Sequence, residues 1–141
     1  MITTIIADDE PLALKLLQSK LNKLGTVEIV AQCNNGRETL LAIAEHQPDL
    51  LILDIQMPKL SGLEVVKKLQ GDNMPLIVFS TAYEQYALEA FDANAVDYVL
   101  KPIDDERIAR AIERASERLA IKAINHSDKA SVIKAITQIN E

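Results

Sequence analysis

The chain has 141 residues, of which 48% are hydrophobic and 26% charged, and it carries a net charge of −6 at pH 7. This composition is typical of one globular domain and excludes disordered, collagen-like and fibrous chains. The acidic balance argues against nucleic-acid binding by these residues alone, because phosphate binding needs a basic face. The single cysteine, Cys33, excludes an internal disulfide framework and a cysteine-rich metal site. Since no apolar run is long enough for a membrane span and no signal peptide is indicated, we expect a cytoplasmic location.

Short apolar runs alternate with longer amphipathic segments along most of the chain. In chain order, the expected strands are 4–7, 27–31, 50–53, 76–79 and 96–100, and the expected helices are 11–24, 37–46, 61–70, 84–92 and one through 108–119. The apolar runs lack strict alternation, which favours strands covered on both faces of a parallel sheet. In the first helix, Leu14, Leu17 and Leu21 recur at helical spacing, and Gly25 follows as a stop signal.

This alternation predicts an α/β fold of the doubly wound, flavodoxin-like kind, with a five-stranded parallel sheet in the order 2-1-3-4-5. Residues 1–122 would form this domain. Residues 123–141 lie outside the repeat, and we expect a break at 125–128 followed by a short amphipathic helix that serves as a linker. Ligands of such sheets bind at the carboxyl ends of the strands, so the chemistry is expected there.

Polar and charged residues follow four of the five expected strands. They are Asp8, Asp9 and Glu10 after the first strand, Asp54 after the third, Ser80 and Thr81 after the fourth, and Lys101 after the fifth. Taken singly, each has an ordinary explanation, such as helix capping or a turn. Together they place carboxylates, hydroxyls and one ammonium at a single edge, where a cation such as Mg²⁺ would offset the repulsion between carboxylates. This set of groups is suited to receiving a phosphoryl group on a carboxylate.

The same positions carry a family resemblance. The matching segments are Asp8 to Pro11, Leu53 to Pro58, Gly62, Thr81 to Ala82, and Asp97 to Pro102. With these motifs, residues 2–120 resemble the receiver domain of bacterial two-component response regulators. The segment from Thr81 to Phe91 further resembles the LytR/AlgR subgroup, whose members usually carry a LytTR-type DNA-binding domain downstream. The resemblance implies that residues 123–141 lead to an output domain that is absent from this sequence, so that DNA would be bound only through that domain.

The resemblance also implies a role for each site residue. Asp54 would be the phosphoacceptor, and Lys101 would pair with the phosphoryl oxygens, with a cis peptide bond between Lys101 and Pro102. Thr81 would hydrogen-bond the phosphoryl group. Tyr98 would be the aromatic residue whose rotamer differs between the two states.

For the metal, the resemblance implies a Mg²⁺ site with three protein ligands. Asp9 and Asp54 would bind the ion through their carboxylates, and Gln56 through its backbone carbonyl. Asp8 would act mainly through a bound water.

Three functions remain to be weighed. A signalling switch would take a phosphoryl group from a sensor histidine kinase on Asp54, and it would not be an enzyme with an external substrate. A phosphatase with an aspartyl nucleophile needs a second carboxylate two residues later, where this chain has Gln56, which cannot titrate. A flavin-binding module needs a phosphate-binding loop after the first strand, where Asp8, Asp9 and Glu10 would repel phosphate. The switch is the favoured interpretation.

The expected output surface is formed by the fourth helix, the fifth strand and the fifth helix, and it would also hold a homodimer together. Charged residues of the fifth helix are interpreted as a solvated face, with a partner-binding surface as the alternative, and Glu106 is expected to pair with Arg110. The others are Arg107, Glu113, Arg114, Glu117 and Arg118.

Overall fold

We describe a computed structural model of the chain, which places the backbone of residues 1–69 and 74–139 and the side chains of these segments as far as residue 124. The strands are β1 (Ile2–Ala7), β2 (Val27–Cys33), β3 (Leu50–Asp54), β4 (Leu76–Thr81) and β5 (Asp97–Leu100). The helices are α1 (Pro11–Leu24), α2 (Gly36–His46), α3 (Gly62–Lys68), α4 (Ala87–Asp92) and α5 (Asp105–Ile139), with the 3-10 turn η1 (Glu84–Tyr86) before α4.

The strands form one parallel sheet in the order β2-β1-β3-β4-β5, which confirms the predicted fold class and strand order. The predicted strands are found, and four of them extend beyond the apolar run that signalled them. For example, β1 begins at Ile2, which pairs with Val27 of β2, and β4 continues to Thr81 because it pairs with Leu100 of β5. Ladder hydrogen bonds therefore carry strands into the polar residues that follow the apolar runs.

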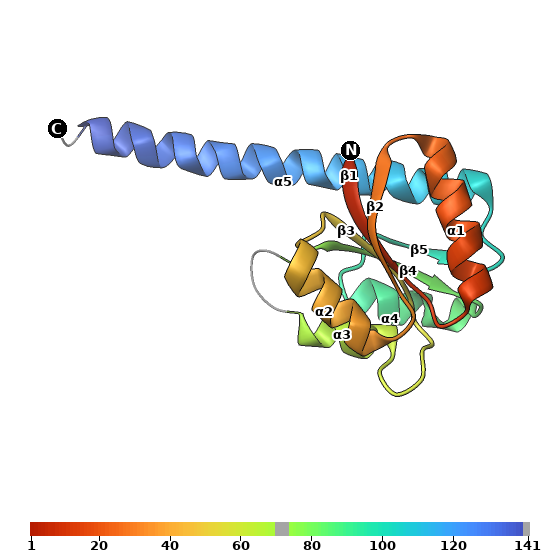
Figure 1. Ribbon diagram of the computed structural model, residues 1–141. Helices are drawn as coiled ribbons and strands as arrows, with labels where there is room; N and C mark the ends of the chain where they lie inside the picture. The colour runs from red at the N-terminus through yellow and green to blue at the C-terminus, as the bar shows by residue number, and fades with distance from the viewer. Residues whose placement is uncertain (70–73, 140–141) are drawn as a thin grey trace.

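Helices cover both faces of the sheet (Figure 1). On one face, α1 and α5 pack on alternate strand residues such as Leu50 and Ile52. On the other, α2, α3 and α4 pack on the intervening residues, including Leu51 and Leu53. All five residues of β3 are buried, because this strand lies in the middle of the sheet with helices on both sides. The continuous apolar run at 50–53 is the sequence signature of that position.

Local signals fix where the helices begin and end. Pro11 lies in the first turn of α1, and Gly25 ends the helix with a φ of 71°. Asn35 caps α2 by accepting a hydrogen bond from the Glu38 amide. Ser61 and Glu64 form a reciprocal capping box at the start of α3. These contacts satisfy amide groups that have no partner within the helix, so the loops at the carboxyl edge of the sheet end in well-defined helix starts.

Two helix predictions are corrected. The single helix expected over 84–92 is a 3-10 turn followed by the six-residue α4, in which Ala90 alone is buried. The helix expected over 61–70 ends at Lys68, and position 70 lies outside the described residues. A segment with few buried apolar side chains has little to hold it in one long helix, which accounts for the short α4.

The break expected at 125–128 is also wrong, because α5 is helical without interruption from Asp105 to Ile139. The polar residues at 125–128 are not helix breakers of the strength of Gly or Pro, so the backbone can continue through them. In Figure 1 the C-terminal half of α5 extends away from the rest of the domain. Within the described residues, no helix is both long enough and apolar enough to cross a membrane.

Candidate functional site

Two buried carboxylates meet one ammonium at the carboxyl edge of the sheet. Asp8 follows β1 and Asp54 ends β3, and each is only 4% exposed. The Nζ atom of Lys101, which follows β5, lies 2.7 Å from an Asp8 carboxylate oxygen and 3.2 Å from one of Asp54. The structure therefore brings together the three charged residues that the sequence placed at separate strand ends.

The loops after β1 and β3 hold these carboxylates by backbone hydrogen bonds. The amide of Glu10 donates to Asp8 (2.9 Å), and the amide of Gln56 donates to Asp54 (3.1 Å). Gly62, at the start of α3, packs directly on the backbone of Asp54, since a Cβ at this position would lie 2.3 Å from the Asp54 carbonyl oxygen. Glycine is thus required here for close approach rather than for a turn conformation.

The pKa values of Asp54 and Lys101 are both shifted by their surroundings. Burial, followed by the negative charge of Asp8, raises the pKa of Asp54 to about 6, although Lys101 and the Gln56 amide oppose the rise. Burial alone would lower the pKa of Lys101, but its hydrogen bond to Asp8 and the charge of Asp54 raise it above its ordinary value. One ammonium between two buried carboxylates leaves an excess of negative charge at this edge.

Further carboxylates lie beside the pair. Asp8, Asp9 and Glu10 each place a carboxylate oxygen within 4.8 Å of the others, with Asp8 buried and the other two exposed. Such hard oxygen donors with excess negative charge fit a divalent cation of the Mg²⁺ kind. Glu10 was not among the expected ligands. The Gln56 side chain is exposed in the loop after β3, one residue beyond Ile55.

The two expected switch residues lie on neighbouring strands. Thr81 is 1% exposed, and its hydroxyl accepts a hydrogen bond from the Tyr83 amide (3.1 Å). Tyr98 is half-buried on β5, and the Arg107 guanidinium carbon lies 6.0 Å from the centre of its ring. The Lys101–Pro102 peptide bond is cis, as predicted.

The interpretation of the α5 charges as a solvated face is wrong for Arg107, and Arg114, although exposed as expected, also contacts a buried carboxylate. Arg107 donates two hydrogen bonds to the buried carboxylate of Asp97 (2.6 and 2.7 Å) and one to the Tyr98 carbonyl (2.6 Å). Arg114 lies 3.1 Å from the same carboxylate. Among the described residues, no ion pair joins Glu106 to Arg110. Asp97 lies inside an expected strand next to apolar residues, which was the available signal for a buried carboxylate in need of a cation.

A second contact also escaped the sequence reasoning. The side-chain amide of Gln56 donates a hydrogen bond to the Tyr86 hydroxyl (3.1 Å), which joins the loop after β3 to the turn before α4. Nothing in the local sequence pairs these two residues.

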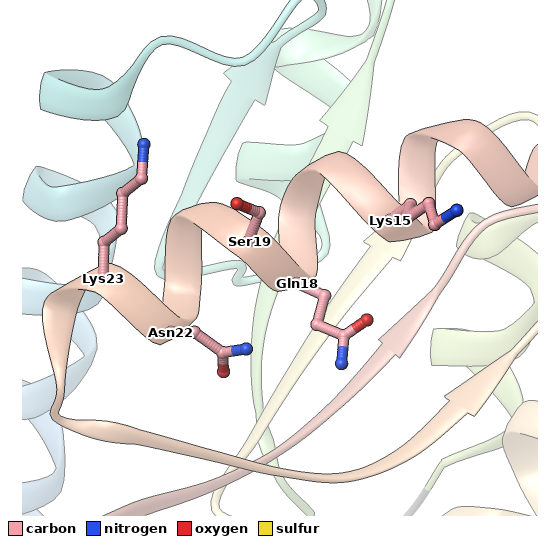
Figure 2. Close-up of a pocket in the computed structure, with 5 residues that line it drawn as sticks. All are labelled: Lys15, Gln18, Ser19, Asn22 and Lys23. Atoms are coloured by element: carbon pink, nitrogen blue, oxygen red, sulfur yellow. The ribbon is translucent and has the colours of Figure 1, made fainter.

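An open hollow lies elsewhere, along α1. It is lined by Lys15, Gln18, Ser19, Asn22 and Lys23, all of which project from this one helix (Figure 2). It shares no residue with the carboxylate cluster. The chemistry of the strand ends, not this hollow, therefore locates the candidate site.

Comparison with known proteins identifies the family. The sequence matches the family described as "Response regulator receiver domain" over residues 4–113, which is most of the chain. The chain belongs to this family. It is 46% identical over 136 residues to an uncharacterized response regulatory protein of Yersinia pestis, covering 96% of this chain and 56% of that protein. It is also 46% identical over 114 residues to the transcriptional regulatory protein BtsR of Escherichia coli K12, covering 81% of this chain and 48% of that protein.

Solved receiver structures share the fold. The response regulatory domain of mrkE from Klebsiella pneumoniae matches with a TM-score of 0.77 and 33% identity, over 83% of this chain and 97% of that one. The receiver domain of AraT from Geobacillus stearothermophilus matches with a TM-score of 0.77 and 28% identity, over 86% and 98%. The receiver chain spans about half the length of the curated relatives it matches.

Proposed function

We propose that this receiver domain accepts a phosphoryl group on Asp54 from a sensor histidine kinase. A carboxylate oxygen of Asp54 would attack the phosphorus, a new P–O bond would form, and the bond from phosphorus to the histidine nitrogen would break. The main support is the pairing of the buried Asp54 carboxylate with Lys101 at 3.2 Å. This ammonium is placed to offset the charge of an incoming phosphoryl group.

Asp54, rather than Asp8, is the better acceptor because of its neighbours. It ends the central strand and pairs in register with Ser80, which places it beside the end of β4 and next to Thr81. Asp8 has the same kinds of contact, with Lys101 at 2.7 Å and with the Glu10 amide, but it follows β1, which does not pair with β4. A phosphoryl group on Asp54 would therefore have an ammonium on one side and a hydroxyl on the other.

Mg²⁺ would be held by the carboxylates of Asp9 and Asp54 and the backbone carbonyl of Gln56, with Asp8 contributing through a water. When bound, the ion supplies positive charge that offsets the oxygens of the transferring group. The exposed carboxylate of Asp9, close to those of Asp8 and Glu10, supports its role as a ligand. Lys101 keeps its place between Asp8 and Asp54 and supplies the second positive charge.

The acceptor is tested by intact mass after incubation with a small phosphodonor and Mg²⁺. We expect one added phosphoryl group on the unmodified chain and none on Asp54→Ala. Asp92→Ala, which changes an exposed aspartate at the end of α4, should be phosphorylated normally. An added phosphoryl group on Asp54→Ala would show that the acceptor has been misassigned.

We further propose that Thr81 transmits the phosphorylated state to Tyr98. The Thr81 hydroxyl would leave the Tyr83 amide and turn toward the phosphoryl group, which would free space behind β4. Tyr98 pairs with Phe79 of β4 and could then turn inward. The surface formed by α4, β5 and α5 would change with it, and this surface is the proposed site of homodimerisation. Leu88 and Phe91 are 68% and 77% exposed on α4, and they give that surface apolar contact area.

Substitution of Thr81 tests this route. Thr81→Ala should leave Asp54 open to phosphorylation but weaken phosphorylation-dependent dimerisation. Sedimentation equilibrium with and without a phosphoryl mimic such as beryllofluoride measures the monomer–dimer balance. Dimerisation equal to that of the unmodified chain would overturn the proposed route through Thr81.

The output is proposed to be transcriptional, through a LytTR-type DNA-binding domain that follows these residues. The support is the resemblance of the Thr81–Phe91 segment to the LytR/AlgR subgroup, together with the similarity to BtsR, whose name describes a transcriptional regulatory protein. A longer chain that contains this receiver should bind a DNA site more tightly when phosphorylated. If residues 1–141 alone bound DNA equally well, the DNA-binding activity would not belong to a separate domain.

A further inference from the structure

Gln56 makes hydrogen bonds through both its backbone and its side chain. Its backbone amide donates to the Asp54 carboxylate (3.1 Å), and its side-chain amide donates to the Tyr86 hydroxyl (3.1 Å). The residue that positions the proposed phosphoacceptor therefore also contacts the last residue of η1, directly before α4. The two partners of the side-chain bond lie 30 residues apart in the sequence.

The segment from Thr81 to α4 has few other attachments. Tyr83 is held by the Thr81 hydroxyl and packs edge-on against Tyr86, with ring centres 6.2 Å apart and planes at 78°. α4 itself buries only Ala90 among its six residues. A helix so weakly anchored takes its position largely from the contacts at its start.

The two polar attachments of this segment respond to the same site. The Thr81 hydroxyl accepts a hydrogen bond from the Tyr83 amide at 3.1 Å, and in the switch proposed above it leaves this amide and turns toward a phosphoryl group on Asp54. When the Thr81–Tyr83 contact is lost, the Gln56–Tyr86 contact is the remaining polar tie between the site and η1 among the described residues. A bond made in only one of two states shifts their balance toward that state.

We propose that the hydrogen bond between the Gln56 side chain and the Tyr86 hydroxyl, here called the Gln56–Tyr86 latch, holds the start of α4 in its unphosphorylated position. Gln56 is then a positioning residue for the switch, acting through Tyr86 on α4. The proposal rests on the proposed function of Asp54 as phosphoacceptor. Removal of the latch lowers the cost of reaching the phosphorylated state, so that state forms more readily.

Tyr86→Phe is the central test, because it removes the hydroxyl and keeps the ring that packs against Tyr83. The affinity for beryllofluoride with Mg²⁺, followed by NMR titration, should rise about two- to fivefold, as expected for the loss of one partly exposed hydrogen bond. Tyr83→Phe is the matched control, because among the described residues the Tyr83 hydroxyl makes no hydrogen bond, and its affinity should not change.

A double substitution separates the latch from a direct effect of Gln56 on the site. In a Gln56→Ala background, Tyr86→Phe should produce no further gain, since its partner is already missing. Urea unfolding of the unphosphorylated variants separates the latch from a purely structural hydrogen bond. Loss of a purely structural bond would lower the stability of the variant and leave its affinity for beryllofluoride unchanged.

The outcomes are distinct. Equal or weaker affinity in Tyr86→Phe, or the same gain with and without Gln56, would overturn the latch while leaving phosphorylation of Asp54 intact. If the unmodified chain took up neither beryllofluoride nor a phosphoryl group at Asp54, the proposed function would fall, and the latch with it.

Discussion

Asp54, the last residue of β3, and Asp97, the first residue of β5, are both buried aspartates that contact cations. Their pKa values are nevertheless shifted in opposite directions. Asp54 is 4% exposed and Asp97 is 8% exposed. Burial and the charge of Asp8 raise the pKa of Asp54 to about 6. Burial alone would raise the pKa of Asp97 as well, but hydrogen bonds from Arg107 and the Tyr98 amide, with the charge of two arginines, hold it below its ordinary value.

The difference lies in the ratio of carboxylates to cations. Asp54 and Asp8 share one ammonium, whereas Asp97 has Arg107 and Arg114 to itself. A carboxylate that is fully compensated stabilises the fold and has little to gain from another ligand. An undercompensated carboxylate costs stability in the free protein but attracts a metal ion and an electrophile. The comparison thus separates a structural aspartate from a reactive one.

The largest expected effect on stability concerns Asp97, whose charge is balanced by two arginines. Asp97→Ala should lower the free energy of unfolding by about 2 to 3 kcal/mol, because it leaves two arginines without their buried partner, while their partial exposure limits the cost. Chemical denaturation at pH 7.5 measures the change. Asp92→Ala, at an exposed aspartate, should change stability by less than about 0.5 kcal/mol. A similar small change for Asp97→Ala would contradict the structural role.

Replacement of Asp54, which shares one ammonium with Asp8, should change the free energy of unfolding in the opposite direction. The folded pKa of Asp54 lies above that of a free aspartate, so folding becomes less favourable as pH rises through the window from about 4 to about 6. A neutral side chain avoids this cost of at most about 3 kcal/mol, part of which is offset by the lost contact with Lys101. Asp54→Asn should therefore raise the free energy of unfolding by about 1 to 2 kcal/mol in metal-free buffer at pH 7.5. A decrease measured by urea unfolding would show that Asp54 is fully compensated.

Mg²⁺ should reduce the same imbalance without a substitution. At ten times its dissociation constant, the ion should stabilise the unmodified chain by about 1.4 kcal/mol, because it binds only the folded state. The direct ligand contributes more than one acting through water, so Asp9→Ala should weaken Mg²⁺ binding more than Asp8→Ala. Calorimetric titration of both variants tests the order. Equal losses would count against the assigned roles of Asp8 and Asp9.

The smallest effect is the pH dependence of the Asp97 pair. Its folded pKa is depressed, so its stabilisation is complete above the unfolded value of about 3.9 and is lost as pH falls through the folded pKa. The stability difference between the unmodified chain and Asp97→Asn should stay constant from pH 7 to about 5 and narrow below about 4. Urea unfolding at a series of pH values measures this difference. A difference that narrows already between pH 7 and 5 would show that another group is responsible.

The extent of prediction from sequence differs between elements. The strand order follows from the alternation of strands and helices along the chain. The burial of β3 follows from its apolar run without alternation, a pattern that depends only on neighbouring residues. The start of α4 and the C-terminal extent of α5 were predicted poorly. In α4, the apolar spacing suggested one helix although only Ala90 found a place in the core, and in α5 polar residues were given too much weight as a break.

The sequence by itself determined which residues lie at the carboxyl edge of the sheet, because a parallel sheet brings the ends of its strands together whatever follows them. Only the tertiary structure decided which cation serves which carboxylate and that Gln56 contacts Tyr86. These contacts join residues 47 apart for Lys101 and Asp54, 30 for Gln56 and Tyr86, and 10 for Arg107 and Asp97. Their side chains meet only after the helices have packed on the sheet, and no pattern of neighbouring residues encodes a contact between residues so far apart in the sequence.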